Sequence, residues 1–531
     1  MKELNISELS VRQKLGIVMT STIRSNNDTI EDMDDNLEFT LELIKNRSLG
    51  AVWVVPKIKH RAEIIEKIRE TADYPLLIIS DAEGGIGEHL IGRHNTIGMA
   101  DSEELAYMFG KVTGISARQM GYNVIGSPVL DRAKEWGGCD KTVRSLGSDK
   151  YRLTALAKAV AQGLQDGGVL TIAKHYPSSD AGSKVDTHMQ EGCSDVNREE
   201  LLADGLYPYI ELMKEGLLDA IMVGHTRLTK IDPKYPASLS PKVINIIREQ
   251  GFDGFAITDA LEMMGIKSKF GAVESKGLSI AAGIDICLPW GNARMDYEAL
   301  CTCYEKGIIT DDRLDEAVRR VLEAQHKVWV REPKYTELTP EDIETFDRLN
   351  WDSVFAKADD GIEPIISRDG KHYFVLLVEN RTSIDGDGRV PEDTFSDAWL
   401  DPIMIKEKIE ELFPNSSMRA IHYFPTALQN RAVMQDSIDY DDVIFITHSE
   451  SGPYVGIGNL THRIVTLIEA LQKTNRISAV VHFGIPHVLE ELPHIPRVII
   501  GCVAKDSTMA ALEVLAGKYP AKGVLTYDVS L

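Results

Sequence analysis

The segment Leu170-Thr171-Ile172-Ala173-Lys174-His175 decides the fold of this chain. Its apolar and β-branched residues run without a polar break, end in two ionisable residues and are bounded by turn residues. Such a run is typical of a strand that is buried on both faces of a parallel sheet. The polar residues at its carboxyl end indicate a functional site, because active sites of α/β barrels form where the strands end.

Seven further segments have the same character and alternate with helical patterns. They are Leu15 to Thr20, Ala51 to Val55, Pro75 to Ser80, Asn123 to Pro128, Ala220 to His225, Phe255 to Asp259 and Asp285 to Leu288. Eight strand and helix units in about 300 residues fit a (β/α)8 TIM-type barrel. The sequence therefore predicts an α/β protein with an N-terminal barrel.

A second domain is predicted after the helical pattern Asp311 to Trp329. Residues 331–349 are taken as a linker because the VREPKYTELTP stretch is polar and contains proline. Five more candidate strands follow, at Tyr373 to Val378, Met418 to Phe424, Val443 to His448, Ile477 to Phe483 and Arg497 to Cys502. We expect a catalytic barrel over residues 1–330 and a smaller α/β/α sandwich over residues 350–531.

The composition is that of a globular protein with a strong acidic excess. The 531 residues are 43% hydrophobic and 26% charged, with a net charge of −23. This charge disfavours nucleic acid and anionic membranes as partners and favours a neutral small molecule. We expect no cleaved signal and no membrane span, because apolar runs of the required length are absent. The six cysteines lack C-x-x-C spacing, so we expect a cytoplasmic protein, as monomer or homodimer, without disulfides or a zinc site.

Nearly every predicted barrel strand is followed by ionisable residues. They are Asp81 and Glu83, Asp131 and Arg144, Lys174 and His175, Asp186 and His188, His225, and Asp259. A cap or a turn would explain each one alone, but their convergence in one barrel mouth is typical of a catalytic pocket. Carboxylates and hydroxyl-binding groups suit a sugar. No nucleotide-binding glycine motif is present and the histidines are scattered, so we expect neither a cofactor nor a metal.

The same residues resemble motifs of glycoside hydrolase family 3, in particular its β-N-acetylglucosaminidase branch. Lys174-His175-Tyr176-Pro177 with Asp186-Thr187-His188 resembles the K-H-F-P … D-S/T-H loop, and Ile257 to Met263 resembles the S-D-x-x-M nucleophile strand. Further marks in order are Asp81 to Gly85, Ser127 to Asp131, Arg144 to Gly147, Met222 to His225, Pro236 to Ser240 and Gly283 to Asp285. The similarity covers about residues 10 to 330, and Gly517 to Pro520 resembles the end of the family's second domain.

The resemblance implies a role for each of these residues. Asp259 would be the nucleophile of a retaining reaction, and His188, held by Asp186, would be the general acid and base. Lys174, His175 and Arg144 would donate hydrogen bonds to sugar hydroxyls, and Asp81 would accept them. The last two members of the predicted substrate-binding set are Asp131 and His225, which could instead brace the pocket.

Two stretches depart from the family pattern. Pro177 is followed by Ser178-Ser179-Asp180-Ala181-Gly182 where the family usually has G-H-G. Ile86 follows Gly85 where the family usually has Arg. These departures bear on the conformation of the loop and on the identity of the favoured glycoside.

The implied activity is that of an exo-acting retaining β-N-acetylglucosaminidase, an O-glycosyl hydrolase that acts on short amino-sugar oligosaccharides or cell-wall fragments. Four alternatives remain open from the sequence. They are a β-N-acetylglucosaminide phosphorylase on the same site, a β-glucosidase, a non-catalytic sugar-binding homologue and a metal-dependent barrel hydrolase.

Overall fold

The structure is a computed structural model that describes residues 2–24, 30–58, 60–133, 141–178, 185–378, 400–449, 452, 454 and 458–531. The chain forms two compact units. The first contains the described residues of Met1–Leu90, Ser102–Ala133 and Arg144–Phe346. The second contains the described residues of Ile91–Asp101, Lys134–Val143 and Asp347–Leu531.

The first unit is built on a parallel sheet with the strand order β1-β2-β3-β6-β7-β9-β11. The strands are β1 (Thr20–Ile23), β2 (Ala51–Val54), β3 (Leu77–Ser80), β6 (Val124–Ile125), β7 (Leu170–Tyr176), β9 (Ala220–Val223) and β11 (Phe255–Thr258). Their residues are almost all buried, as the near-continuous apolar runs predict.

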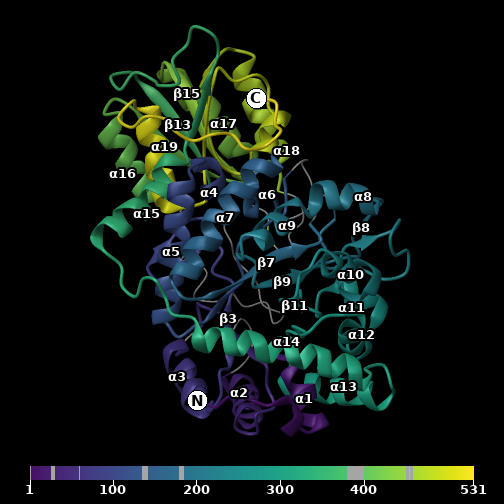
Figure 1. Ribbon diagram of the computed structural model, residues 1–531. Helices are drawn as coiled ribbons and strands as arrows, with labels where there is room; N and C mark the ends of the chain where they lie inside the picture. The colour runs from purple at the N-terminus through teal and green to yellow at the C-terminus, as the bar shows by residue number, and fades with distance from the viewer. Residues whose placement is uncertain are drawn as a thin grey trace. The chain divides into compact units, whose positions relative to one another are not determined.

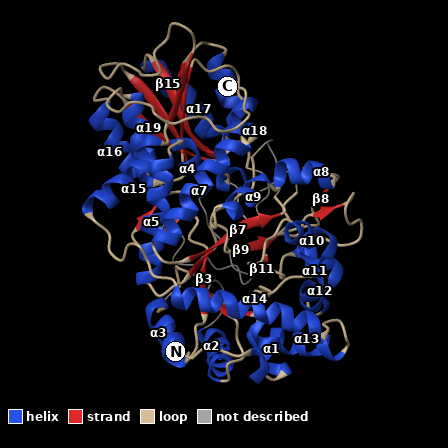
Figure 2. Cartoon of the chain, in the orientation of Figure 1, coloured by secondary structure: helices blue, strands red, loops and turns tan. Residues whose placement is uncertain are grey.

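Helices surround these strands (Figures 1 and 2). They are α1 (Val11–Ile17), α2 (Ile30–Lys45), α3 (Arg61–Thr71), α5 (Glu103–Gln119), α7 (Lys150–Asp166), α8 (Arg198–Glu200), α9 (Tyr207–Lys214), α10 (Pro241–Glu249), α11 (Met264–Phe270), α12 (Glu274–Ala282), α13 (Ala293–Glu305) and α14 (Asp311–Val330). The short helix α6 (Lys141–Arg144) has only Arg144 in this unit. Two short strand pairs decorate the loops, β4 (Gly85–Ile86) with β5 (His89–Leu90) and β8 (Cys193–Ser194) with β10 (Arg227–Leu228).

Residues 285–288 lie between the two edge strands of this sheet. Isolated parallel bridges join Ile286 to Ile257 in β11, and Cys287 to Met19 just before β1. The amide of Thr20 donates to the carbonyl of Cys287 at 2.9 Å, so this segment connects both edges. The predicted barrel-type α/β fold is therefore confirmed, with an eighth segment that pairs through single bridges instead of a regular ladder.

The bounds predicted for the first strand are wrong. Leu15 and Ile17 belong to helix α1, and the strand begins at Thr20. The reason is local, because Ser10 and Gln13 form a reciprocal capping box that starts a helix at Val11. The buried face of that helix reads, in sequence, like the start of an apolar strand.

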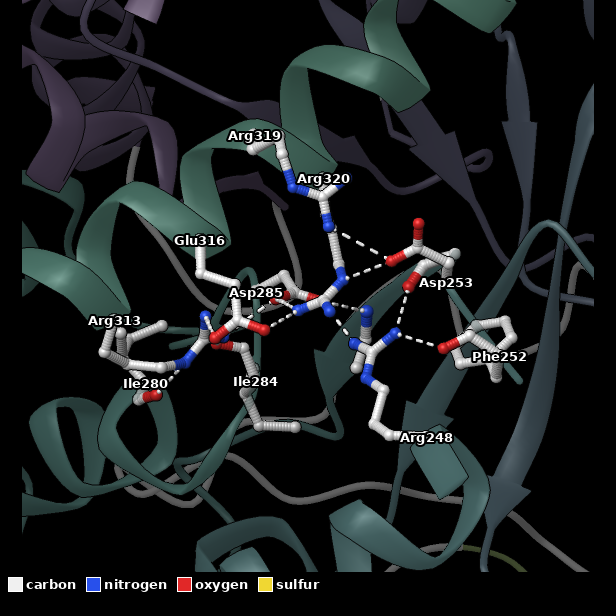
Figure 3. Close-up of polar contacts among 12 residues, drawn as sticks. Arg248, Phe252, Asp253, Ile280, Ile284, Asp285, Arg313, Glu316, Arg319 and Arg320 are labelled. Carbon is white, nitrogen blue, oxygen red and sulfur yellow. Dashed lines mark hydrogen bonds and ion pairs between the residues drawn. The ribbon is translucent and has the colours of Figure 1, made fainter. Parts of the chain in front are cut away.

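Asp285 ties the start of the eighth segment to two helices (Figure 3). Its carboxylate is fully buried and accepts from Arg248 at 2.6 Å, Arg313 at 2.8 Å and Arg320 at 3.3 Å. It also accepts from the amide of Ala256 in β11 at 2.9 Å. Since Ala256 lies near the amino end of its strand, the cluster braces the end of the barrel opposite to the polar strand ends.

The second unit has a six-stranded sheet with the order β12-β17-β16-β15-β13-β14. The strands are β12 (Phe355–Ala358), β13 (His372–Val378), β14 (Ser417–His422), β15 (Asp442–Ser449), β16 (Ile477–Gly484) and β17 (Arg497–Gly501). All pair in parallel except β12, an antiparallel edge strand. The five predicted strands are present, and the half-exposed β12, which has no apolar run, was missed.

The helices of the second unit cover this sheet. They are α4 (Asn95–Ala100), α15 (Pro340–Asp352), which begins in the first unit, α16 (Pro402–Leu412), α17 (Ala427–Asp436), α18 (His462–Gln472) and α19 (Lys505–Leu515). Buried residues of α16 and α19 form one hydrophobic core with alternate residues of the strands. The buried residues of α18 are not part of that core, and α18 contacts β16. The predicted second α/β domain is confirmed, and its exact boundaries stay a prediction.

No helix in the described part of the chain combines the length and the apolarity that crossing a bilayer requires.

Candidate active site

Lys174, near the carboxyl end of β7, is buried between two carboxylates. Its Nζ lies 2.5 Å from Oδ1 of Asp81 and 2.6 Å from Oε1 of Glu83, both on the loop after β3. Burial lowers the pKa of Lys174, but the charges of Asp81 and Glu83 outweigh it and leave this pKa above its usual value. The side chain is therefore an ammonium at neutral pH, with three N–H donors to distribute.

Glu83 also holds Arg144, which in turn contacts His175. The guanidinium donates to Glu83 from Nε at 2.8 Å and from Nη2 at 2.7 Å, and Nη2 lies 3.2 Å from Nε2 of His175. Nδ1 of His175 lies 2.5 Å from Oδ2 of Asp131. Because a guanidinium can only donate, Nε2 of His175 accepts and Nδ1 donates to Asp131. The network thus fixes one tautomer of His175.

Asp186 and His188 form a second carboxylate–imidazole pair. Oδ1 of Asp186 accepts from both Nδ1 and the backbone amide of His188, each at 2.8 Å. The Asp186 side chain is 4% exposed and that of His188 is 20% exposed. With Nδ1 bound to the carboxylate, Nε2 is the nitrogen that can exchange a proton with a ligand.

Asp259 follows β11, and three histidines act on its carboxylate electrostatically. Its Oδ1 accepts from the amide of Ala260 at 2.8 Å. Burial raises the pKa of Asp259, but the electrostatic effects of His175, His225 and His188, together with that amide, outweigh it and lower this pKa below its usual value. Because this pKa is lowered, the carboxylate is ionised at neutral pH.

His225, which follows β9, is held on both ring nitrogens. Nδ1 lies 2.8 Å from Oγ of Ser238 and Nε2 lies 3.0 Å from the carbonyl of Ala260. Since a carbonyl only accepts, Nε2 donates and Nδ1 accepts. Burial lowers the pKa of His225, which keeps the ring neutral. Its position is that of a brace for the residue after Asp259, and its predicted contact with substrate stays a prediction.

The structure joins five of the predicted site residues through direct contacts. Asp81, Lys174, Arg144, His175 and Asp131 form one continuous hydrogen-bonded network through Glu83. Asp131 is fully buried, so within this network it orients His175. Among the described residues, no three His, Cys, Asp or Glu side chains are grouped as a metal site. The arrangement offers an ionised carboxylate, an imidazole paired with a second carboxylate, and a set of groups that can bind hydroxyls.

Residues 11–324 match the family model described as the glycosyl hydrolase family 3 N-terminal domain. The chain belongs to glycosyl hydrolase family 3. Among curated family relatives, the "Beta-hexosaminidase LpqI" of Mycobacterium tuberculosis is 33% identical over 232 residues, which are 40% of this chain and 58% of that one. The "Beta-N-acetylglucosaminidase/beta-glucosidase" of Cellulomonas fimi is 27% identical over 282 residues, 49% of each chain. The chain thus spans about half the length of these relatives.

Two solved structures share the fold over almost the whole chain. One is a family 3 β-N-acetylglucosaminidase from Paenibacillus sp., with a TM-score of 0.80, 23% identity and coverage of 98% of this chain and 99% of that one. The other is the β-glucoside phosphorylase BglX, with a TM-score of 0.79, 21% identity and coverage of 98% and 95%. At this identity the likeness shows the architecture of both units.

Glu83 takes part in this network, although the sequence named it only among the ionisable residues that follow strands and not in the substrate-binding set. It accepts from Lys174 and, through both oxygens, from Arg144. The signal was present in the sequence, because Glu83 follows β3 two residues after Asp81. What the sequence could not show is that two cations from distant segments converge on this one carboxylate.

The two departures from the family 3 pattern have different positions. Ile86 lies in β4 and is 1% exposed, so it belongs to the core of the first unit. Of the altered loop, Ser178 is buried and its amide donates to the carbonyl of His175 at 2.8 Å. Residues 179–184 lie outside the described part of the chain, so the expectation for this loop stays a prediction.

Proposed function

We propose that this family 3 protein is a retaining, exo-acting β-N-acetylglucosaminidase of short amino-sugar oligosaccharides or cell-wall fragments. The observation that carries the proposal is the Asp186–His188 pair, whose imidazole interacts electrostatically with Asp259. The names of the relatives from Mycobacterium tuberculosis and Cellulomonas fimi support the sugar class.

In the first step Asp259 is the nucleophile. An ionised carboxylate oxygen attacks the anomeric carbon and forms an ester bond while the glycosidic C–O bond breaks. His188, as an imidazolium, transfers its Nε2 proton to the departing oxygen, so the leaving group departs as a neutral alcohol. Asp186 stabilises the imidazolium and sets which nitrogen gives up the proton.

In the second step the same imidazole works in reverse. Neutral His188 accepts a proton from a water molecule, whose oxygen attacks the anomeric carbon and displaces Asp259. Two inversions at one carbon give net retention of configuration. A single histidine serves both half-reactions because the ring that has given up its proton in the first step is the base that the second step needs.

The network around Lys174 supplies the sugar-binding groups. Asp81, whose side chain is 46% exposed, can accept from hydroxyls, and Lys174 and Arg144 can donate to them. In the tautomer that the network fixes, His175 has no N–H left for a hydroxyl, so its predicted donor role stays a prediction. Glu83 holds the two cations in place and balances their charge. Such a prearranged set of donors and acceptors strongly favours a sugar that carries the matching hydroxyl over one that lacks it.

The test is hydrolysis of 4-nitrophenyl N-acetyl-β-glucosaminide and of the corresponding β-glucoside, with and without added phosphate. We expect release of free N-acetylglucosamine that does not depend on phosphate, and a weaker reaction with the glucoside. A sugar 1-phosphate product would make the enzyme a phosphorylase, a preference for the glucoside would make it a β-glucosidase, and no turnover would favour a sugar-binding protein. Loss of activity with a chelator would indicate a metal-dependent hydrolase. The cytoplasmic location and the monomeric or homodimeric state stay predictions.

A further inference from the structure

Helix α11, which follows the loop after Asp259, begins without a capping side chain. Its first residue is Met264, and Met263 before it makes no side-chain capping bond. The first N–H groups of a helix have no partner within the helix and need one from elsewhere. Here the amide of Met264 donates to the carbonyl of His188 at 2.9 Å, and the amide of Gly265 donates to the carbonyl of Thr187 at 3.1 Å. The turn that carries His188 therefore caps the helix.

Gly265 allows this turn to approach so closely. A Cβ atom at this position would lie 2.5 Å from the carbonyl oxygen of Thr187 and 2.7 Å from that of Gln190. Carbon and oxygen do not approach below about 3 Å without a shift, because van der Waals repulsion rises steeply. The two oxygens belong to backbone on both sides of His188, so a side chain at residue 265 would displace the turn as a whole.

The same turn is closed internally and fastened at its far end. The amides of Met189 and Gln190 both donate to the carbonyl of Asp186 at 3.0 Å. Glu191 then accepts from Lys269 of α11 at 3.2 Å and from Arg227 of β10 at 2.9 Å. The nucleophile side is fastened too, because His225 donates to the carbonyl of Ala260 at 3.0 Å. The turn and the segment after Asp259 are thus connected within a few residues of each catalytic group.

We propose that Gly265 is a positioning residue that sets the distance from His188 to the sugar held at Asp259, by docking the 186–190 turn onto the start of α11. This inference rests on the proposed function, because it concerns the group that protonates the leaving oxygen. Gly265 contacts neither substrate nor a catalytic side chain and acts only through the backbone of the turn.

The substitution Gly265→Ala tests the proposal. Relief of the contact requires the turn to retreat by at least about 0.5 Å, and a displacement near 1 Å at a catalytic group can cost about a hundredfold in rate. We expect kcat/KM for N,N′-diacetylchitobiose, whose leaving group needs a proton, to fall about ten- to a hundredfold. For a 2,4-dinitrophenyl N-acetyl-β-glucosaminide, whose leaving group needs none, kcat/KM should change less than about threefold.

The matched control is Gly277→Ala in α12. A Cβ atom there would lie 2.5 Å from the Cβ atom of Cys303, an equally close approach at a place with no link to the turn. We expect this variant to lower stability and to leave the ratio of the two kcat/KM values unchanged. An equal loss for both substrates in Gly265→Ala, or a changed ratio in Gly277→Ala, would overturn the proposal.

Two further measurements separate this inference from the proposed function. If wild type shows no activity on either substrate, or if His188→Ala does not change the ratio, the proposed function fails. If His188→Ala changes the ratio and Gly265→Ala does not, only the role of Gly265 fails. Should Gly265→Ala not fold, hydrogen exchange of wild type decides, because the amides of Met264 and Gly265 should exchange as slowly as those inside α11. Exchange at the rate of an exposed turn would overturn the proposal.

Discussion

Replacement of Asp285 by Asn should strongly destabilise the first unit without altering the reaction. The carboxylate is fully buried and accepts from three arginines (Figure 3). It also accepts from the amide of Ala256. An Asn side chain has nearly the same shape but turns an NH₂ group toward guanidinium donors and removes the charge. Breaking a buried ion pair costs about 3–5 kcal/mol, and we expect a loss of about 4 kcal/mol from the free energy of unfolding.

The assay is urea-induced unfolding followed by tryptophan fluorescence, with kcat/KM measured before denaturation. With an m-value of about 3 kcal/mol/M, a loss of 4 kcal/mol lowers the midpoint by about 1.3 M. The control is Asp253→Asn, since the Asp253 side chain is 66% exposed although it pairs with Arg319 and Arg320. An exposed pair of this kind is worth about 0–1 kcal/mol. Equal shifts for the two variants, or a shift below about 0.3 M for Asp285→Asn, would refute the reasoning.

Three other changes have defined outcomes. Glu83→Gln should raise KM about tenfold or more, because Lys174 and Arg144 lose the carboxylate that holds them; an unchanged KM on the nitrophenyl substrate would contradict this. Asp131→Asn should lower kcat/KM because it weakens the bond that fixes the tautomer of His175, and a variant with wild-type kinetics would show that this tautomer is unimportant. Burial lowers the pKa of His482 to about 3 in the folded chain, from its usual value of about 6.5. Below about pH 6.5 this histidine therefore binds a proton in the unfolded chain but not in the folded chain. Stability from this residue is complete above about pH 6.5 and falls by about 1.4 kcal/mol per pH unit below it; urea unfolding at pH 7 and pH 5 should show a smaller pH effect in His482→Gln, and an identical effect would contradict the assignment.

Much of the fold followed from residues whose environment is set by their own segment. Apolar runs such as Leu170 to Ala173 can only be buried on both faces, so their number and spacing predicted the barrel and the second sheet. The bounds of the first strand were predicted wrongly because Leu15 and Ile17 suit the buried face of a helix as well as a strand. The capping box at Ser10 decides in favour of the helix. The segment 285–288 is held in place by the contacts of Asp285 with Arg248 and Arg313. These arginines belong to helices outside the segment, so its own residues do not reveal the contacts.

The site was predictable to the extent that strand ends converge, which a parallel barrel guarantees. The partners within it were not predictable, because they depend on side-chain reach across the barrel mouth. Glu83 was predicted only as one of several ionisable residues after a strand, and its contacts with Lys174 and Arg144 give it a defined place in the network. For His225 the sequence left substrate binding and bracing both open, and its two ring nitrogens bind protein atoms, as a bracing residue requires.

The most direct measurement is trapping of the glycosyl-enzyme with a fluorinated slow substrate, followed by peptide mapping. The account predicts one added sugar per chain, ester-linked to Asp259 in the peptide that contains Thr258 and Ala260, and no adduct in Asp259→Asn. A sugar attached to any other residue, or no adduct from an enzyme that turns over the parent glycoside with retention, would contradict it.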